Sequence, residues 1–210
     1  MLFFLAAASV VTAIDAERAF ISDAHTHGQW TAFRKWAAED AVMFSPNAVW
    51  AREYLKDKKD PPKSIDWAPA ESWVACDGRT AINRGPWSNA GKGQGYFTTV
   101  WMKGTSSWRW VYDGGDALSA PMTEPKVAKV VRANCRNLSK VRAAYRKATV
   151  STERLAGKQP GEAGQGRSAD GTLIYQWKVA VDGARHFQAK LWNGRAYRVI
   201  LDQNVAAPPK

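Results

Sequence analysis

Asp113 is the residue with the clearest potential for acid/base chemistry. It closes the segment Trp108–Asp113 (WRWVYD), which has the aromatic and β-branched residues of a β-strand. Aromatic neighbours exclude water and raise the pKa of a carboxyl group, which would make Asp113 a general base. The alternative is a local role, in which Asp113 caps a turn at Gly114-Gly115.

Asp23 and His27 form a second acid/base candidate. They lie four residues apart in a predicted helix, Asp15–His27, so their side chains share one face and can form a hydrogen bond. The pair suits acid/base catalysis if that face lines a cavity. Otherwise the pair is solvated or caps the helix.

The sequence predicts no metal site and no cofactor. His25 and His27 are two residues apart on a helix and point in different directions, and His186 is the one remaining histidine. The sequence contains no phosphate-binding loop, no dinucleotide fingerprint and no G-x-S-x-G nucleophile motif. Neither cysteine has an adjacent histidine, so a thiol nucleophile is not indicated.

Eleven tryptophans are present in 210 residues, and several of them fall on the predicted strands. Strict alternation along Trp108–Asp113 places Trp108, Trp110 and Tyr112 on one face, and Arg109, Val111 and Asp113 on the other. The aromatic side chains either form the core or line a pocket for an apolar or planar ligand. The candidate ligand-binding residues are Tyr96, Trp101, Trp108, Trp110 and Tyr112.

Helical patterns come first in the sequence and strand patterns follow, which is typical of an α+β fold. The predicted helices are 15–27, 30–38, 47–56 and 138–149, and the predicted strands are 41–45, 71–76, 79–87, 94–103 and 108–113, with 127–135 open to either assignment. Pro86 is expected to end its strand, and five glycines between residues 157 and 171 indicate a flexible linker. A three-stranded meander (172–181, 185–192, 195–203) is predicted from the turn pairs Asp182-Gly183 and Asn193-Gly194.

Two segments resemble the nuclear transport factor 2-like superfamily, which includes SnoaL-like cyclases and ketosteroid isomerase. The first is WTAFRKWAAEDAVMF (30–44), and the second is YFTTVWMKGTSSWRWVYD (96–113). The resemblance implies a cone-shaped domain over residues 14–136, in which a curved antiparallel sheet wraps around the N-terminal helices and leaves a cavity. A connector (137–171) and the meander (172–204) would follow, the meander packing on the first domain.

The superfamily includes acid/base enzymes, small-ligand binders and protein-docking modules, so the resemblance does not select one function. By analogy with the isomerase, Tyr96 would donate a hydrogen bond to an oxyanion. The superfamily also implies a homodimer formed through the sheets, unless the meander covers that surface.

The positive charge is concentrated in the C-terminal part. Residues 1–120 hold 13 Lys/Arg and 13 Asp/Glu, and residues 121–210 hold 17 and 6, so the excess of 17 − 6 = +11 lies there. This asymmetry predicts contact with an anionic surface, or a solvated face that only aids solubility. Nucleic acid is not expected as a partner, because no nucleic-acid motif accompanies the charge.

The N-terminus resembles a secretory signal. Residues 2–11 are apolar, and Val11-Thr12-Ala13 offers small residues for cleavage after Ala13, although no basic residue precedes the run. The alternative is an apolar extension of the first helix. A signal predicts a periplasmic or secreted protein, in which Cys76 and Cys135 either pair or remain two buried thiols.

Three functions are consistent with the sequence. The first is an exported protein that binds a small apolar ligand or a partner protein. The second is an isomerase, dehydratase or hydrolase without a cofactor, using Asp113 or the Asp23/His27 pair as base. The third is an anion-binding module that uses the basic C-terminal part.

Overall fold

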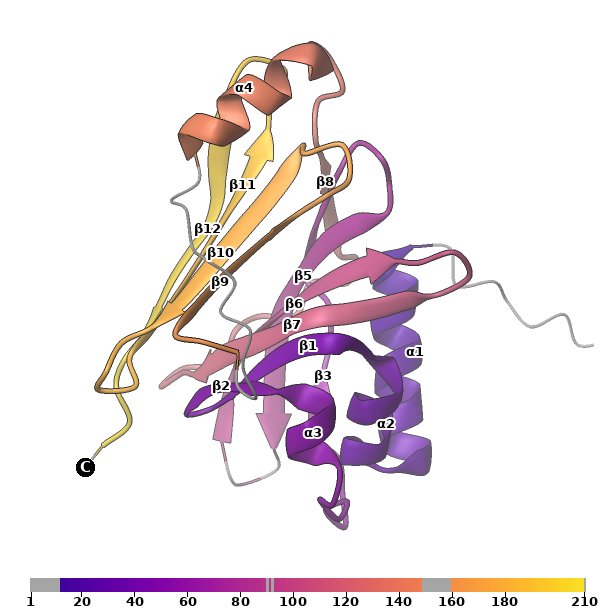
Figure 1. The fold of residues 1–210 in the computed structure, drawn as a ribbon. Helices are drawn as coiled ribbons and strands as arrows, with labels where there is room; N and C mark the ends of the chain where they lie inside the picture. Colours follow the sequence, from indigo (N-terminus) through magenta and orange to yellow (C-terminus); the bar gives the residue numbers. More distant parts are fainter. Residues whose placement is uncertain (1–11, 90, 92, 149–159, 210) are drawn as a thin grey trace, which may run out of the picture.

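The computed structural model describes residues 12–89, 91, 93–148 and 160–209, which form helices and two β-sheets (Figure 1). The helices are α1 (Ala13–His27), α2 (Gln29–Trp36), α3 (Ala51–Leu55) and α4 (Leu138–Ala148). The first sheet contains β1 (Ala37–Ser45), β2 (Asn47–Trp50), β3 (Asp66–Trp67), β4 (Glu71–Val74), β5 (Thr80–Asn89), β6 (Gly93–Lys103), β7 (Trp108–Ala117) and β8 (Lys129–Arg132). The second contains β9 (Ala163–Arg167), β10 (Leu173–Val179), β11 (Arg185–Trp192) and β12 (Tyr197–Val205).

The first sheet is mixed, which corrects the prediction of a purely antiparallel sheet. The strand order is β2-β1-β7-β6-β5-β4-β8. Strand β3 also pairs with β5, next to β4. Strand β1 runs parallel to β7, and β8 runs parallel to β4. Both pairs join strands that are distant in sequence, and local turn signals cannot predict such pairing.

Helices α1 and α2 pack on one face of the first sheet. Phe20 and Phe33 from the helices lie in one buried cluster with Trp101, Trp108 and Trp110 from the strands. The α+β class is therefore confirmed, and the indoles of Trp101, Trp108 and Trp110 are hidden from water. Among the described residues, no helix has the length and apolar character needed to cross a membrane.

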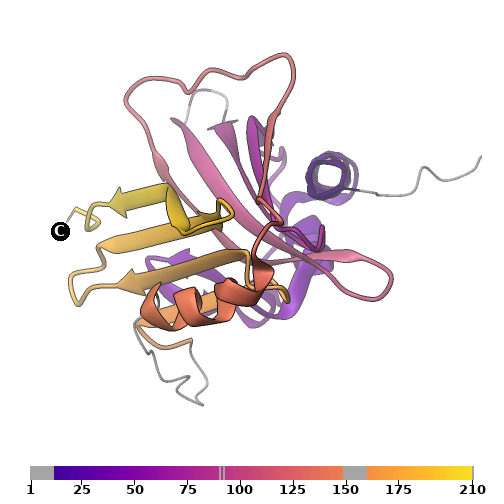
Figure 2. The same ribbon diagram turned by 90° about the horizontal axis from the view of Figure 1, so that it is seen from above.

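The second sheet covers the opposite face of the first. Leu173, Trp177 and Phe187 form a second buried cluster with Val100 and Tyr112 of the first sheet. Viewed from above, the first sheet lies between α1 and the second sheet (Figure 2). The second sheet has four strands rather than three, because residues 163–167 pair with β10 instead of remaining in the linker.

Several local predictions differ from the structure. Helix α1 begins at Ala13, two residues before its predicted start at Asp15, because Thr12 is the N-cap and Asp15 completes a capping box with it. Pro86 lies inside β5 and does not end the strand, contrary to the prediction. Its carbonyl accepts a hydrogen bond from the Ala68 N–H, although proline has no N–H to donate. Residues 47–50 form a strand before a short helix. The predicted signal, residues 1–13, lies almost entirely outside the described residues, while Ala13 is buried at the start of α1.

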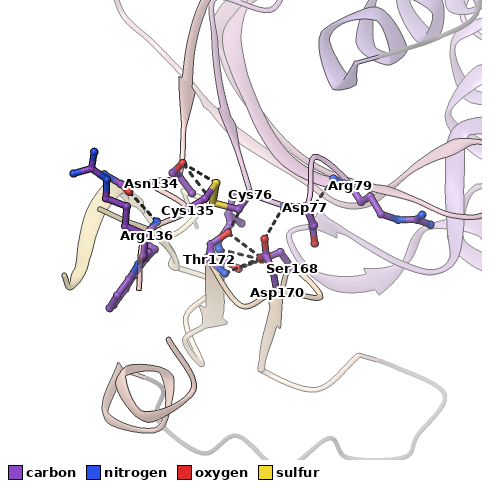
Figure 3. The surroundings of a disulfide bond; sticks show 12 residues. Cys76, Asp77, Arg79, Asn134, Cys135, Arg136, Ser168, Asp170 and Thr172 are labelled. Carbon is purple, nitrogen blue, oxygen red and sulfur yellow. Dashed lines mark hydrogen bonds between the residues drawn. A yellow bond between two sulfur atoms is a disulfide. The ribbon is translucent and has the colours of Figure 1, made fainter. Parts of the chain in front are cut away.

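A disulfide joins Cys76, which follows β4, to Cys135, which follows β8 (Figure 3). Beside it, the Cys76 N–H donates to Thr172 Oγ1 at 2.9 Å, and the Asp77 N–H donates to Asp170 Oδ2 at 2.6 Å. Asp77 Oδ2 in turn accepts from the Ala169 N–H at 3.1 Å. The turn after β4 is therefore joined covalently to the end of β8, and hydrogen bonds join it to the turn that precedes β10.

Candidate functional site

A cavity of about 480 Å³ opens beside the last residues of β7. Its apolar walls come from α1, α2 and the strands of the first sheet, and one polar wall comes from β7. The lining residues are Phe20, Phe33, Met43, Phe44, Ile65, Trp67, Trp87, Asn89, Tyr96, Phe97, Asp113, Gly114, Gly115, Asp116, Ala117 and Arg185. Pockets of this size and composition bind small, largely apolar molecules.

A β-bulge at Val111 turns Asp113 toward this cavity. On β6, Val100 pairs with Tyr112 and the next residue, Trp101, pairs with Trp110, so Val111 is the extra residue. A bulge shifts the alternation of side chains by one residue. Asp113 therefore shares the helix-facing side with Trp108 and Trp110, and Tyr112 moves to the opposite side. The strict alternation predicted from the sequence is wrong at this point.

Asp113 has the properties of a general base. Its Oδ2 accepts a hydrogen bond from Thr99 Oγ1 at 3.1 Å, across the β6–β7 pair. Burial is the main cause that raises the pKa of Asp113 to about 7, the charge of Glu17 contributes to the rise, and the Thr99 hydrogen bond opposes it. Gly114 and Gly115 continue β7, so Asp113 caps no turn there. A carboxyl group with a pKa near neutrality can both accept and return a proton.

Tyr96 also lines the cavity, on the strand next to Asp113. Burial raises the pKa of its phenol, and the charge of Asp116 adds to the rise, while Arg84 and Arg185 lower it. The guanidinium of Arg84 lies 5.1 Å from the centre of the Tyr96 ring. The phenol therefore stays protonated at neutral pH and can donate a hydrogen bond.

The other four predicted ligand-binding aromatics are core residues and are absent from the cavity lining. Trp101, Trp108 and Trp110 are at most 2% exposed in the helix-side cluster. Tyr112 packs against Phe187 of the second sheet, with 4.6 Å between the ring centres. Of the two roles that the sequence left open for these four side chains, their positions fit core packing. The aromatic lining comes instead from Phe20, Phe33, Phe44, Trp67, Trp87 and Phe97, which tertiary packing brings together.

Asp23 and His27 share one face of α1, as their spacing indicated, but that face does not line the cavity. Asp23 Oδ2 accepts from Trp36 Nε1 at 2.6 Å and from Lys35 Nζ at 2.5 Å, whereas His27 Nε2 is 3.9 Å from Asp23 Oδ1. Burial would raise the pKa of Asp23, but the hydrogen bonds and charges of these partners hold it below its usual value. Asp23 therefore fastens α1 to α2.

Glu17 is a buried carboxyl group that the sequence patterns did not single out. It is fully buried and accepts hydrogen bonds from Trp67 Nε1 at 3.0 Å, Trp101 Nε1 at 2.6 Å and Asn83 Nδ2 at 3.2 Å. Burial raises its pKa, and the three hydrogen bonds oppose the rise. A signal was present in the sequence, because Glu17 lies on the same helical face as Ala13 and Phe20.

Among the described residues, no group of three His, Cys, Asp or Glu side chains is arranged to hold a metal ion. The histidines of the His25-Thr26-His27 segment each face a single carboxylate. His25 Nε2 lies 3.4 Å from Asp66 Oδ1, and His27 lies beside Asp23.

No family model matches the chain, and no curated protein matches it. Solved structures do match, over about half of the chain. One is a candidate ketosteroid isomerase from Parabacteroides distasonis, with a TM-score of 0.43 and 16% identity over 51% of this chain and 89% of that chain. A DUF3225 protein of unknown function from Pectobacterium atrosepticum matches with a TM-score of 0.39 and 13% identity, covering 54% of this chain and 94% of that one.

A candidate aromatic ring hydroxylase from Novosphingobium aromaticivorans matches with a TM-score of 0.36 and 15% identity, covering 52% of this chain and 89% of that one. With TM-scores below 0.5 and such low identities, no residue role is transferred from them.

Proposed function

We propose that the protein binds a small, largely apolar ligand in the cavity beside β7. The observation that carries the proposal is the cavity itself, about 480 Å³ in volume and lined by aromatic side chains from α1, α2 and the first sheet. Burial of apolar surface supplies the affinity, and the few polar groups on the β7 wall supply the orientation.

A neutral fluorescent probe, N-phenyl-1-naphthylamine, tests this proposal. We expect the native protein to bind the probe saturably at one site. The variant Ala117→Trp, which narrows the cavity, should bind the probe about tenfold or more weakly. Leu118→Trp is the matched control, because Leu118 is the next residue and is absent from the cavity lining. Equal affinities of the two variants, or no saturable binding to the native protein, would contradict the proposal.

Proton transfer by Asp113 is the second candidate function, and the raised pKa of about 7 supports it. A carboxylate that lines an apolar cavity can remove a proton from carbon. Tyr96 lines the same cavity, and its protonated phenol can donate to an oxygen that gains charge. This arrangement suits an isomerase, dehydratase or hydrolase that needs no cofactor.

The Kemp elimination of 5-nitrobenzisoxazole reports such a base. Asp113 takes the carbon-bound proton, the C–H electrons form the nitrile, and the N–O bond breaks to release a phenolate. Because the deprotonated carboxylate is the active form, we expect the rate to rise as pH increases through about 7. Asp113→Asn should lower the rate about a hundredfold, with Asp57→Asn as the control, because Asp57 is exposed and absent from the cavity lining. A rate that is independent of pH between 5 and 8, or unchanged in Asp113→Asn, would exclude Asp113 as the base.

A basic surface supports a separate proposal, that the protein contacts an anionic membrane. Segment 126–142 contains no acidic residue, and its six basic residues are all exposed: Lys126, Lys129, Arg132, Arg136, Lys140 and Arg142. Val127, Val130 and Leu138 are exposed among them. Exposed apolar side chains between cations favour a lipid surface over nucleic acid, because they can be buried among acyl chains.

Sedimentation with vesicles tests the membrane contact. We expect binding to phosphatidylglycerol vesicles and not to phosphatidylcholine vesicles, with affinity falling as salt rises from about 50 to about 300 mM. Replacing Lys129, Arg132 and Lys140 with glutamine should weaken binding by about 1 kcal/mol per residue. Binding that is insensitive to salt would contradict an electrostatic contact.

We also propose that the protein works in an oxidising compartment outside the cytoplasm. The Cys76–Cys135 disulfide supports this, because such bonds persist in oxidising compartments. The homodimer expected from the superfamily is not part of the proposal, because the second sheet already covers the outer face of the first.

A further inference from the structure

Arg185 is the one residue of the second sheet that lines the cavity. It opens β11 and shares the inward face of that strand with Phe187 and Ala189, both buried. The second sheet therefore does more than cover the first sheet, because it also places a cation at the wall of the cavity.

The guanidinium of Arg185 is held in place but is not neutralised. Its Nη2 donates to the carbonyl of Gly115 at 3.1 Å, and its centre lies 4.9 Å from the centre of the Phe44 ring. Among the described residues, no salt bridge joins Arg185 to a carboxylate, including Asp113 and Asp116 of the same cavity. A carbonyl and an aromatic ring orient a guanidinium without cancelling its charge.

The remaining N–H groups of Arg185 are thus available to a ligand. A planar guanidinium matches a carboxylate in shape and charge and can donate two parallel hydrogen bonds to it. The two carboxylates of the β7 wall have other partners, since Asp116 Oδ1 accepts from the Ala117 N–H at 2.8 Å and Asp113 Oδ2 accepts from Thr99 Oγ1 at 3.1 Å.

We propose that Arg185 makes the cavity selective for apolar molecules that carry a carboxylate, by binding that carboxylate with its guanidinium. The inference rests on the proposed ligand-binding function and names the class of ligand. The aromatic walls would hold the apolar body, and the carboxylate would lie at the second-sheet side of the cavity.

Two matched competitors test the inference. The carboxylate 2-naphthoate and the neutral 2-naphthamide have the same ring system and nearly the same size, and each is titrated against bound N-phenyl-1-naphthylamine. In the native protein we expect 2-naphthoate to bind about tenfold to a hundredfold more tightly than 2-naphthamide, the range for hydrogen bonds to charged groups. Arg185→Gln should remove this difference, and Arg185→Lys should restore part of it.

Lys190→Gln is the control, since Lys190 lies on β11 but outside the cavity. Unchanged affinity of Arg185→Gln for the neutral probe shows that the cavity persists. Equal affinities of the two competitors for the native protein overturn the inference and leave the proposed function standing. An equal loss of affinity for all three compounds in Arg185→Gln also overturns it, because Arg185 would then only support the wall. If none of the three compounds binds the native protein, the proposed function fails as well.

Discussion

Replacing Glu17 with alanine is expected to lower the free energy of unfolding by about 3 to 5 kcal/mol, because the buried indole N–H groups of Trp67 and Trp101 lose their acceptor. Asn83 Nδ2 loses one of its two bonds and keeps the one to the Ala13 carbonyl. The indole N–H groups of Trp67 and Trp101 and the amide of Asn83 all donate to this carboxyl group. Each unsatisfied buried donor costs about 1 to 3 kcal/mol, and the release of a desolvated carboxyl group offsets part of that cost. Urea unfolding followed by tryptophan fluorescence measures the change.

Arg18→Ala is the matched control for this variant. Arg18 is the next residue of α1 and is exposed, so its loss should change stability by less than about 0.5 kcal/mol. A double-mutant cycle with Trp101→Phe, which removes the N–H but keeps an aromatic ring, isolates the hydrogen bond between the two side chains. A cost below about 1 kcal/mol for Glu17→Ala would contradict the role given to this carboxyl group.

The cavity should also respond to Glu17. Trp67 forms part of the cavity wall, and its indole is held by Glu17 Oε1. The charge of Glu17 contributes to the raised pKa of Asp113. One buried carboxyl group on α1 therefore stabilises the core and also sets the shape and the electrostatics of the candidate site.

Local signals in the sequence predicted the hairpins of this fold well. The Asp182-Gly183 and Asn193-Gly194 pairs mark the β10–β11 and β11–β12 turns, and the aromatic strand 94–103 lies within one residue of its observed bounds. Such turns depend on a few adjacent residues, because the left-handed backbone that they need is favourable for glycine.

Features that depend on distant parts of the chain were not predicted. The parallel pairing of β1 with β7 and of β8 with β4 joins segments with no local signal for each other. A single bulged residue, Val111, decided which face Asp113 occupies, and nothing in WRWVYD marks it. Asp113 lines the cavity, although the predicted alternation placed it on the face opposite Trp108 and Trp110.

Loss of the Cys76–Cys135 disulfide is expected to lower the free energy of unfolding by about 4 kcal/mol. The bond closes a loop between cysteines that are 59 residues apart, and the entropy of closing such a loop in the unfolded chain sets this magnitude. The double variant Cys76→Ala/Cys135→Ala and the native protein reduced with dithiothreitol should show the same fall in the urea midpoint. The double variant should not respond to dithiothreitol.

The effect should be localised as well as global. Strand β8 has four residues, lies at the edge of the first sheet and pairs with β4. The disulfide is the covalent link that holds its end beside the turn after β4. Hydrogen exchange should therefore increase first at residues 129–132 in the double variant, before β5 and β6 at the centre of the sheet respond. If reduction frees two thiols without changing either the urea midpoint or the exchange of β8, the bond does not hold this edge. The hydrogen bonds made by Asp77 and Asp170 would then be the contacts that hold the turn after β4 against the second sheet.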